Sequence, residues 1–274
     1  LFDEADNMTD TALNPENSSN QPEQAYSVES LSVKAFADQD SMAAAAAMDV
    51  GDYLAGVLRQ QDTARAILAT GNSQILFLSK LIERGGVDWS RVELFHMDEY
   101  LGLNADHPAS FRRYMRERVE SVVKPKAFHY LDGSALLPLD ECERYSDLLK
   151  QAPVDLCCLG VGENGHIAFN DPPVANFEDP YLVKIVQLDA TCKEQQVGEG
   201  HFSSLETVPG YALTLTIPAL CASNKMVCLA PERRKSQAIH DALKKPVSTD
   251  CPASFLRTQS QATLYLDKES STLL

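Results

Sequence analysis

The chain has 274 residues, of which 44% are hydrophobic, and its 39 acidic and 24 basic side chains give a formal net charge of −15. This length and composition exclude wholesale disorder and allow one large α/β domain or two small ones. A surface this acidic repels nucleic-acid phosphates, and no apolar run approaches the ~20 residues of a membrane span, so neither nucleic acid nor membrane is an expected partner.

The first 25 residues predict a disordered tail, because they combine Asn, Ser, Gln, Pro and acidic residues with no Lys or Arg. They have neither the basic nor the apolar segment of a signal peptide. Since the sequence starts at Leu1, it leaves open whether a targeting segment precedes it. Residues 26–274 contain no Pro/Gly/Ser-rich linker and are expected to form a single domain.

The chain has an odd number of cysteines and no CxxC spacing, which predicts free thiols in a reducing compartment, here the cytoplasm. They are Cys142, Cys157, Cys158, Cys192, Cys221, Cys228 and Cys251. Cys157 and Cys158 are adjacent on a predicted strand, so their side chains should face opposite ways, which argues against a shared metal. We expect no metal site.

Strands and helices are predicted to alternate along the chain. The elements are a strand at 30–37, a helix at 40–61 capped by Asp40 or Ser41, a strand at 64–70, a helix at 73–86, a strand and loop at 91–100, a helix at 110–123, a strand at 127–133, a helix at 139–152, strands at 154–162, 182–189, 211–217 and 225–231, a helix at 232–245, and a strand at 262–267. The strands are short apolar runs, which indicates an α/β fold with helices on both faces of a mostly parallel sheet. Ligands bind beyond the carboxyl ends of such strands, so the loops there are candidate sites.

The stretch "LATGNSQ" at 68–74 leads from a strand into a helix. Free backbone N–H groups at a helix start, with the hydroxyls of Thr70 and Ser73 and a close approach at Gly71, suit an anion. An ordinary helix cap is the alternative.

A second candidate anion site is "APERRKSQAI" at 230–239, which places Arg233, Arg234 and Lys235 in the first turn of a helix. Cations there oppose the helix dipole, so an anion lying among them is the simplest explanation. A solvated basic face is the alternative.

Two acidic residues, Asp98 and Glu99, directly follow an apolar strand. One acid at a strand end is usually a cap or a solvated turn, but two at the ligand edge favour a functional role. A metal site made of His96, Asp98 and His107 is a weak alternative, because the spacing matches no zinc motif.

The stretch "LGVGENGHIAFNDPP" at 159–173 puts His166 in a glycine-rich loop after a strand. Glycines allow the backbone to approach a ligand, and nearby acidic or amide side chains could fix the imidazole tautomer. A structural or exposed histidine is the alternative. Together these loops suggest a phosphorylated small molecule and proton-transfer chemistry.

The motifs "LATGNS", "FHMDEYLGLNADHPASF", "LGVGENGHIAFNDP", "VPGYALTLTIPAL" and "KSQAI" occur in this order over about residues 30–267. They resemble the glucosamine-6-phosphate deaminase family, within the group that includes 6-phosphogluconolactonase. "GHIAFND" fits the deaminase branch, because lactonases of the group typically read GHTASLF there. The resemblance implies a three-layer α/β/α, modified Rossmann-like fold without a cofactor, and conversion of glucosamine 6-phosphate and water into fructose 6-phosphate and ammonia.

The resemblance also implies roles for single residues. Asp98 matches the base that moves a proton between C2 and C1, and His166 matches the histidine that opens the sugar ring. Asp171 matches a residue that supports this histidine, and Asn164 is placed to orient it. The phosphate-binding positions match Thr70, Gly71, Asn72, Ser73 and Lys235.

Several residues depart from the family pattern. Asn164 stands where well-known members have an acid, and Asp171 stands where they usually have glutamate. "TGNSQ" replaces TGGTP. The arginine that usually helps to hold phosphate is missing near Gln196, and Arg233 or Arg234 is a candidate to replace its charge.

These departures keep two further hypotheses open. One is hydrolysis of 6-phosphogluconolactone, which needs no base at C2. The other is a sugar-phosphate sensor that has lost catalysis. The sequence predicts no particular oligomeric state.

Overall fold

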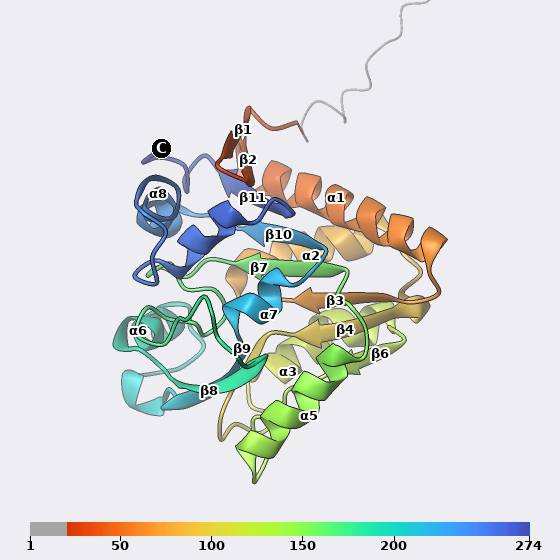
Figure 1. Cartoon of the computed structure of the whole chain (residues 1–274), viewed down its shortest axis with the longest axis vertical. Helices are drawn as coiled ribbons and strands as arrows, with labels where there is room; N and C mark the ends of the chain where they lie inside the picture. Colours follow the sequence, from red (N-terminus) through yellow and green to blue (C-terminus); the bar gives the residue numbers. More distant parts are fainter. Residues whose placement is uncertain (1–20) are drawn as a thin grey trace, which may run out of the picture.

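The computed structural model of the protein describes residues 21–274 (Figure 1). The tail predicted for residues 1–25 falls largely outside the described residues, and its last two residues belong to the first strand, which begins at Gln24. That strand was not predicted, because its side chains are mostly exposed and show no apolar run.

The core of the fold is an eight-stranded sheet with the order β1-β2-β11-β10-β7-β3-β4-β6. Its strands are β1 (Gln24–Val28), β2 (Leu31–Phe36), β3 (Ala64–Leu68), β4 (Val92–His96), β6 (Ala127–His129), β7 (Leu156–Gly160), β10 (Lys225–Leu229) and β11 (Ala262–Asp267). Every neighbouring pair is parallel except the β1–β2 hairpin. The predicted α/β class with a mostly parallel sheet is confirmed.

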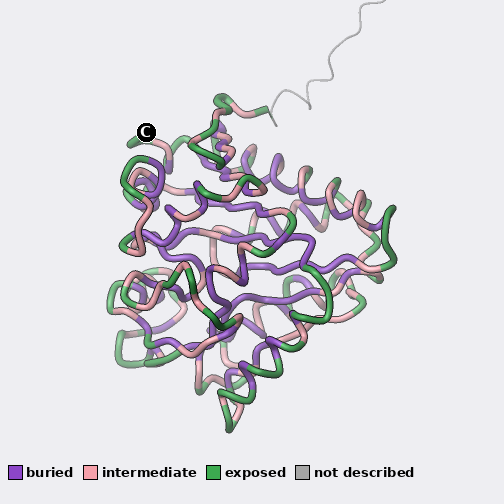
Figure 2. The backbone as a smooth tube through the Cα atoms, viewed as in Figure 1, coloured by how far each residue is buried: buried purple, intermediate pink, exposed green. Residues whose placement is uncertain are grey.

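Helices cover both faces of this sheet, which makes three layers (Figure 1). One face packs against α1 (Gln39–Gln60), α2 (Asn72–Arg84) and a helix that runs from α3 (Phe111–Met115) through a π-helical segment to α4 (Ser121–Val123). The other packs against α5 (Pro138–Lys150), α7 (Ile217–Cys221) and α8 (Ser236–Lys244). Figure 2 shows the strands buried between these layers.

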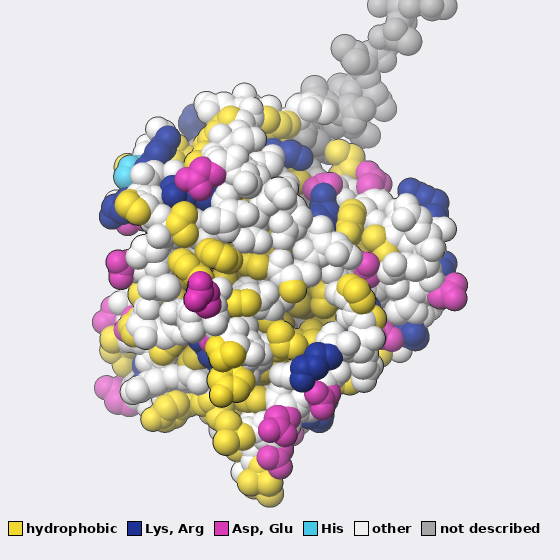
Figure 3. All heavy atoms as spheres, viewed as in Figure 1, with side chains coloured by type: hydrophobic (Ala, Val, Ile, Leu, Met, Phe, Trp, Pro, Cys, Tyr) yellow, Lys and Arg dark blue, Asp and Glu magenta, His cyan; other side chains and the backbone are white. Residues whose placement is uncertain are grey.

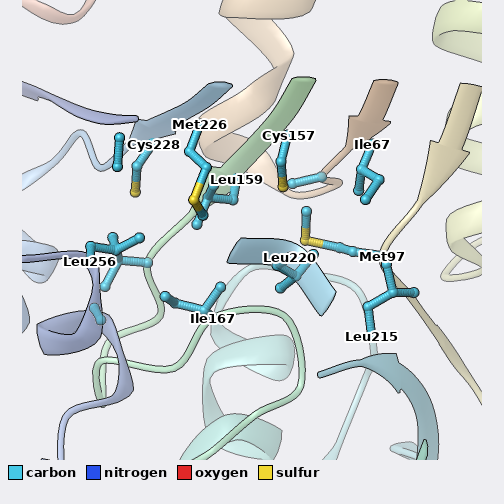
Figure 4. Close-up of a cluster of buried hydrophobic side chains, with 14 of the residues drawn as sticks. Ile67, Met97, Cys157, Leu159, Ile167, Leu215, Leu220, Met226, Cys228 and Leu256 are labelled. Carbon is cyan, nitrogen blue, oxygen red and sulfur yellow. The ribbon is translucent and has the colours of Figure 1, made fainter. Parts of the chain in front are cut away.

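The two adjacent cysteines of β7 show the alternation directly. Cys157 belongs to the core on the α5 side, where Figure 4 shows it with Ile67 and Met97, and Cys158 belongs to the core on the α1 side. Their predicted opposite orientation is confirmed, and all seven cysteines are free thiols.

A second, three-stranded antiparallel sheet was not predicted. It consists of β5 (Asp98–Tyr100), β9 (Tyr211–Leu215) and β8 (Val183–Gln187), in that order. The apolar pattern identified β8 and β9 as strands but predicted a loop at β5, and it could not say which sheet each strand joins. One face packs on the main core and the other on a small aromatic cluster beside α6 (Ala190–Gly198), a helix that was also missed.

The N-cap of α1 is Asp38, whose carboxylate accepts from the N–H of Ser41 at 2.8 Å, so the predicted caps were wrong by two or three residues.

No helix within residues 21–274 has the length and hydrophobicity needed to cross a bilayer. The loop before α5 exposes Leu136, Leu137 and, at the first turn, Leu139, and Figure 3 shows hydrophobic side chains at this tip.

Candidate active site

The candidate site is a cleft at the carboxyl ends of the central parallel strands. The chain runs from β3 outward to β4 and β6, then returns to β7 and continues the other way to β10, so β3 and β7 flank a switch point. Residues that follow β3, β4, β7 and β10 line a cleft of about 620 Å³, part of it open to solvent. This is the edge at which the sequence placed its four loops.

His166 is packed against the backbone of its own loop. A Cβ atom on Gly162 would collide with three atoms of the imidazole ring, so glycine is required at that position. The N–H of Gly162 donates to the carbonyl of His166 at 2.9 Å, which closes the loop. Gly165 has a φ of 82°, in the left-handed region that favours glycine.

The tautomer of His166 follows from its hydrogen bonds. Its backbone N–H donates to Oδ1 of Asn164 at 3.1 Å, which identifies that oxygen as an acceptor. Nδ1 lies 2.8 Å from this oxygen and 2.9 Å from Oδ1 of Asp171, so Nδ1 carries the hydrogen. Nε2 is therefore the nitrogen left for chemistry in the cleft.

Asn164 and Asp171 lie behind the imidazole and do not line the cleft. Nδ2 of Asn164 donates to Oδ1 of Asp171 at 2.9 Å, so both side chains belong to one network. Burial acts to raise the pKa of Asp171, but hydrogen bonds and charge from His166, together with Asn164, outweigh burial and lower this pKa. Asp171 is thus an anion that can stabilise an imidazolium.

Asp98 lines the cleft from β5 and is only 6% exposed. Burial and, to a lesser extent, the neighbouring charge of Glu99 raise the pKa of Asp98 well above its usual value. A carboxylate with a raised pKa is a stronger base than an exposed one.

Glu99 points to the other face of β5 and away from the cleft. Its carboxylate accepts from the backbone N–H groups of Phe111 at 3.2 Å and Arg112 at 3.0 Å, at the start of α3. It also forms an ion pair with the Arg112 side chain at 3.3 Å. Of the two predicted acids, one faces the cleft and the other caps a helix.

The loop from Thr70 to Ser73 lines the cleft at the N-terminus of α2. Gly71 is the N-cap residue, with a φ of 99° and no side chain to satisfy the first N–H groups of the helix. Hydroxyl groups of Thr70 and Ser73 stand beside these donors. The arrangement suits an anion, since free N–H groups and the helix dipole act together.

Lys235 and Arg234 bring positive charge to the same cleft, whereas Arg233 does not line it. Lys235 is 4% exposed, and burial lowers its pKa, although the charge of Glu199 opposes this shift. Arg234 lies in the 3-10 turn η5 (Arg233–Lys235). Of the two arginines proposed to replace the missing charge, the structure places only Arg234 in the cleft.

Three carboxylates surround the guanidinium of Arg234. Nη1 lies 3.1 Å from Glu163 and 2.7 Å from Glu199, and Nε lies 2.7 Å from Glu232. An anion among these cations was the simplest expectation from the sequence, and the protein's own carboxylates supply part of that negative charge. Glu163 thus pairs with Arg234 and takes no part in holding His166.

Four cleft residues from α6 and the turn after it were not predicted as site residues. Gln195, Gln196, Glu199 and His201 line the cleft. Burial acts to raise the pKa of Glu199, but hydrogen bonding from His201 and the charges of Lys235 and Arg234 lower it to about 2. The polar, glycine-bearing stretch "QQVGEGHF" was the available signal, but α6 has too weak an apolar stripe to be recognised as a helix.

The weak alternative of a metal site at His96, Asp98 and His107 is not supported. Nε2 of His96 accepts from the N–H of Leu131 at 2.8 Å, and burial lowers the pKa of His96 to about 3. Nδ1 of His107 accepts from the N–H of Ala109 at 3.1 Å. These three side chains do not form a metal-ligating group within residues 21–274.

The family model described as glucosamine-6-phosphate isomerases/6-phosphogluconolactonase matches residues 37–265. A glucosamine-6-phosphate deaminase of Exiguobacterium sibiricum is 35% identical over 207 residues, which cover 76% of this chain and 80% of that protein. A glucosamine-6-phosphate deaminase of Listeria monocytogenes is also 35% identical, with 76% and 86% covered.

Among solved structures, a monomeric glucosamine-6-phosphate deaminase superposes with a TM-score of 0.81 at 27% identity, covering 88% of this chain and 99% of that one. A 6-phosphogluconolactonase from Thermotoga maritima gives a TM-score of 0.71 at 23% identity, covering 87% and 100%, which shows a shared fold. With the family model matched over most of its length, the chain belongs to the glucosamine-6-phosphate isomerase/6-phosphogluconolactonase family.

Proposed function

We propose that this protein is a glucosamine-6-phosphate deaminase, which converts glucosamine 6-phosphate and water into fructose 6-phosphate and ammonia. The observation that carries the proposal is the placement of a buried carboxylate, a histidine with a fixed tautomer and an uncapped helix N-terminus around one cleft. The deaminases of Exiguobacterium and Listeria, similar over three quarters of this chain, support it.

The phosphate group is expected to bind at the start of α2. The free N–H groups after Gly71 and the hydroxyls of Thr70 and Ser73 donate to its oxygens. Lys235 and Arg234 supply the positive charge. Arg234 takes the place of the arginine that the family pattern has near Gln196.

Ring opening is assigned to His166. With Nδ1–H held by Asn164 and Asp171, Nε2 of the imidazolium can donate a proton to the ring oxygen, and the neutral Nε2 can then accept the proton of the anomeric hydroxyl. The anionic Asp171 stabilises the positive charge on the ring before the transfer.

The C2 proton transfer is assigned to Asp98. As a carboxylate it removes the proton from C2 of the open-chain aldehyde, and the carboxylic acid so formed returns that proton to C1 of the resulting enolamine. The product has a C=N bond at C2, which water hydrolyses to the ketone and ammonia. Atoms balance without any redox cofactor.

The test is ammonia release from glucosamine 6-phosphate by the purified chain. Asp98→Asn should abolish it, and Asp62→Asn, a matched change at an exposed residue beyond the end of α1, should leave it intact. Full activity in Asp98→Asn removes the assigned base. If the protein hydrolyses 6-phosphogluconolactone and Asp98→Asn keeps this activity, the protein is a lactonase. If calorimetry shows that it binds glucosamine 6-phosphate without turnover, it is a sensor.

A further inference from the structure

Behind the catalytic imidazole lies a compact group of three potential metal ligands. His166, Asp171 and Cys192 each offer one ligand atom, and these atoms all lie within 4.8 Å of one another. The exposed fractions of the three residues are 8%, 0% and 1%. They come from different segments, because Cys192 lies in the first turn of α6 and the other two lie in the loop after β7.

The donor set suits a thiophilic cation. Thiolate, imidazole and carboxylate are the ligands that Zn²⁺ prefers, and three of them leave one of four tetrahedral positions open. With metal–ligand distances of about 2.0–2.3 Å, tetrahedral ligand atoms stand roughly 3.5 Å apart. Because the present separations are at most 4.8 Å, side-chain movements of about one ångström would close the group around an ion.

A second observation points to the same place. Oδ2 of Asp171 is buried and has no hydrogen-bond partner with ordinary geometry among residues 21–274, whereas Oδ1 is used by Asn164 and His166. The thiol of Cys192 lies beside this carboxylate. An unpartnered buried oxygen next to a thiol and an imidazole nitrogen is an arrangement that a cation would satisfy.

We propose that His166, Asp171 and Cys192 form an inhibitory binding site for Zn²⁺ or a similar thiophilic divalent cation. Of the three residues, only His166 lines the cleft, so its imidazole ring separates the proposed ion from the cleft. Binding moves the hydrogen of the neutral imidazole from Nδ1 to Nε2 and displaces the thiol hydrogen of Cys192, so one proton is released for each ion bound.

Inhibition follows from the mechanism proposed above. A metal on Nδ1 removes the hydrogen bond that fixes the tautomer and prevents the ring from becoming an imidazolium, so the ring oxygen receives no proton. Asp171 binds the metal at the same time, so its carboxylate no longer stabilises an imidazolium. The binding itself does not depend on which substrate the cleft accepts.

The experiment is a titration of the metal-free full-length chain with Co²⁺, read by the near-ultraviolet thiolate-to-cobalt band and the visible bands of tetrahedral cobalt. One Co²⁺ per chain should bind, and Zn²⁺ should displace it. Cys192→Ser should abolish the thiolate band and weaken binding by more than about tenfold. Cys221→Ser, at a partly exposed thiol outside the group, is the matched control and should keep both.

Absence of the thiolate band in the unmodified chain, or a band that persists in Cys192→Ser and disappears in Cys221→Ser, overturns the proposal. Asp171→Asn provides a second variant if Cys192→Ser does not fold, and it should weaken Co²⁺ binding while the thiolate band remains. In the activity assay, Zn²⁺ should inhibit ammonia release and a chelator should restore it. Cobalt binding without any deaminase activity would refute the proposed function and leave the metal site standing.

Discussion

At the scale of single residues, neighbouring acids of one strand have opposite tasks. Asp98 and Glu99 are consecutive in β5, so their side chains leave opposite faces. The first enters the cleft and the second reaches the start of α3. Sequence alone identified the pair. Their different roles follow from the alternation of side chains along a strand, once β5 is known to be a strand.

We expect the ionised Asp98 carboxylate to support activity and to lower the stability of the fold. Its folded-state pKa is raised, so its neutral form is favoured in the fold and its contribution to stability falls as pH rises through that raised pKa. Asp98→Asn removes this penalty, and each unit of pKa shift corresponds to about 1.4 kcal/mol. We therefore expect the variant to be inactive and to have a higher free energy of unfolding in urea at pH 8 than the unmodified chain, with the difference shrinking at pH 4. A variant that is less stable at both pH values contradicts this.

The raised pKa of Asp98 also sets the acid limb of the activity profile. The base must be ionised, so kcat/KM should fall with decreasing pH at a higher pH than an ordinary carboxylate, near 4, would produce. A pH–rate profile measured with glucosamine 6-phosphate checks this. An acid limb below pH 4 would show that Asp98 with its raised pKa is not the essential base of the free enzyme.

Asn164 is the residue that departs most clearly from the family pattern, and its amide bonds to both partners of the network. Asn164→Asp adds a second carboxylate beside the imidazole, which stabilises the imidazolium. The basic limb of the kcat/KM profile should therefore move to higher pH. Asn176→Asp, an exposed position outside the cleft, serves as the control. An unmoved basic limb would mean that Asn164 only shapes the loop.

Among the candidate residues, those in local motifs could be found from the sequence, and those brought in by tertiary structure could not. Thr70, Asp98 and His166 each follow a recognisable apolar strand. Glu199 and Cys192 lie on or after a weakly amphipathic helix, and no local pattern links them to the cleft. Their proximity depends on how α6 packs, which a single sequence does not reveal.

At the scale of elements, the carboxylate of Glu99 replaces a local N-cap for α3, since Ser110 at the N-cap position makes no capping bond. Glu99→Ala removes the acceptor of three backbone N–H groups, two of them at the start of α3, and a partner of the buried Arg112, and should lower the free energy of unfolding by about 2–4 kcal/mol. Glu117→Ala, at an exposed pair with Arg113, should cost less than about 0.5 kcal/mol. Equal losses in urea denaturation would contradict the capping role.

The elements that the sequence failed to predict share a physical reason. β1 pairs with β2 at the sheet edge and exposes most of its side chains. Backbone hydrogen bonds to β2 therefore stabilise it more than burial of apolar side chains does. β5 is only three residues long, and the sequence pattern predicts the end of one strand and a loop at this place. A single-sequence pattern detects burial well and detects pairing poorly.

At the scale of the whole molecule, the proposed base and the proposed phosphate site belong to different sheets. Asp98 belongs to the three-stranded sheet, and the loop at Gly71 follows a central strand of the large sheet. β8 is an edge strand with partly exposed residues, whereas β7 is central and almost fully buried. We expect amide hydrogens of β8 to exchange faster than those of β7 in hydrogen-exchange mass spectrometry. Equal protection would mean that the two sheets open together.

The carboxylates around Arg234 have a consequence for ligand selection. Glu163 and Glu199 are tethered competitors of any phosphate, because they occupy the guanidinium in the free protein at a high effective concentration. We expect inorganic phosphate alone to displace them poorly, because it makes no contacts beyond those of the phosphate group. A sugar phosphate gains additional contacts through its hydroxyls, so it can. The cleft would thus remain available in a cell rich in free phosphate.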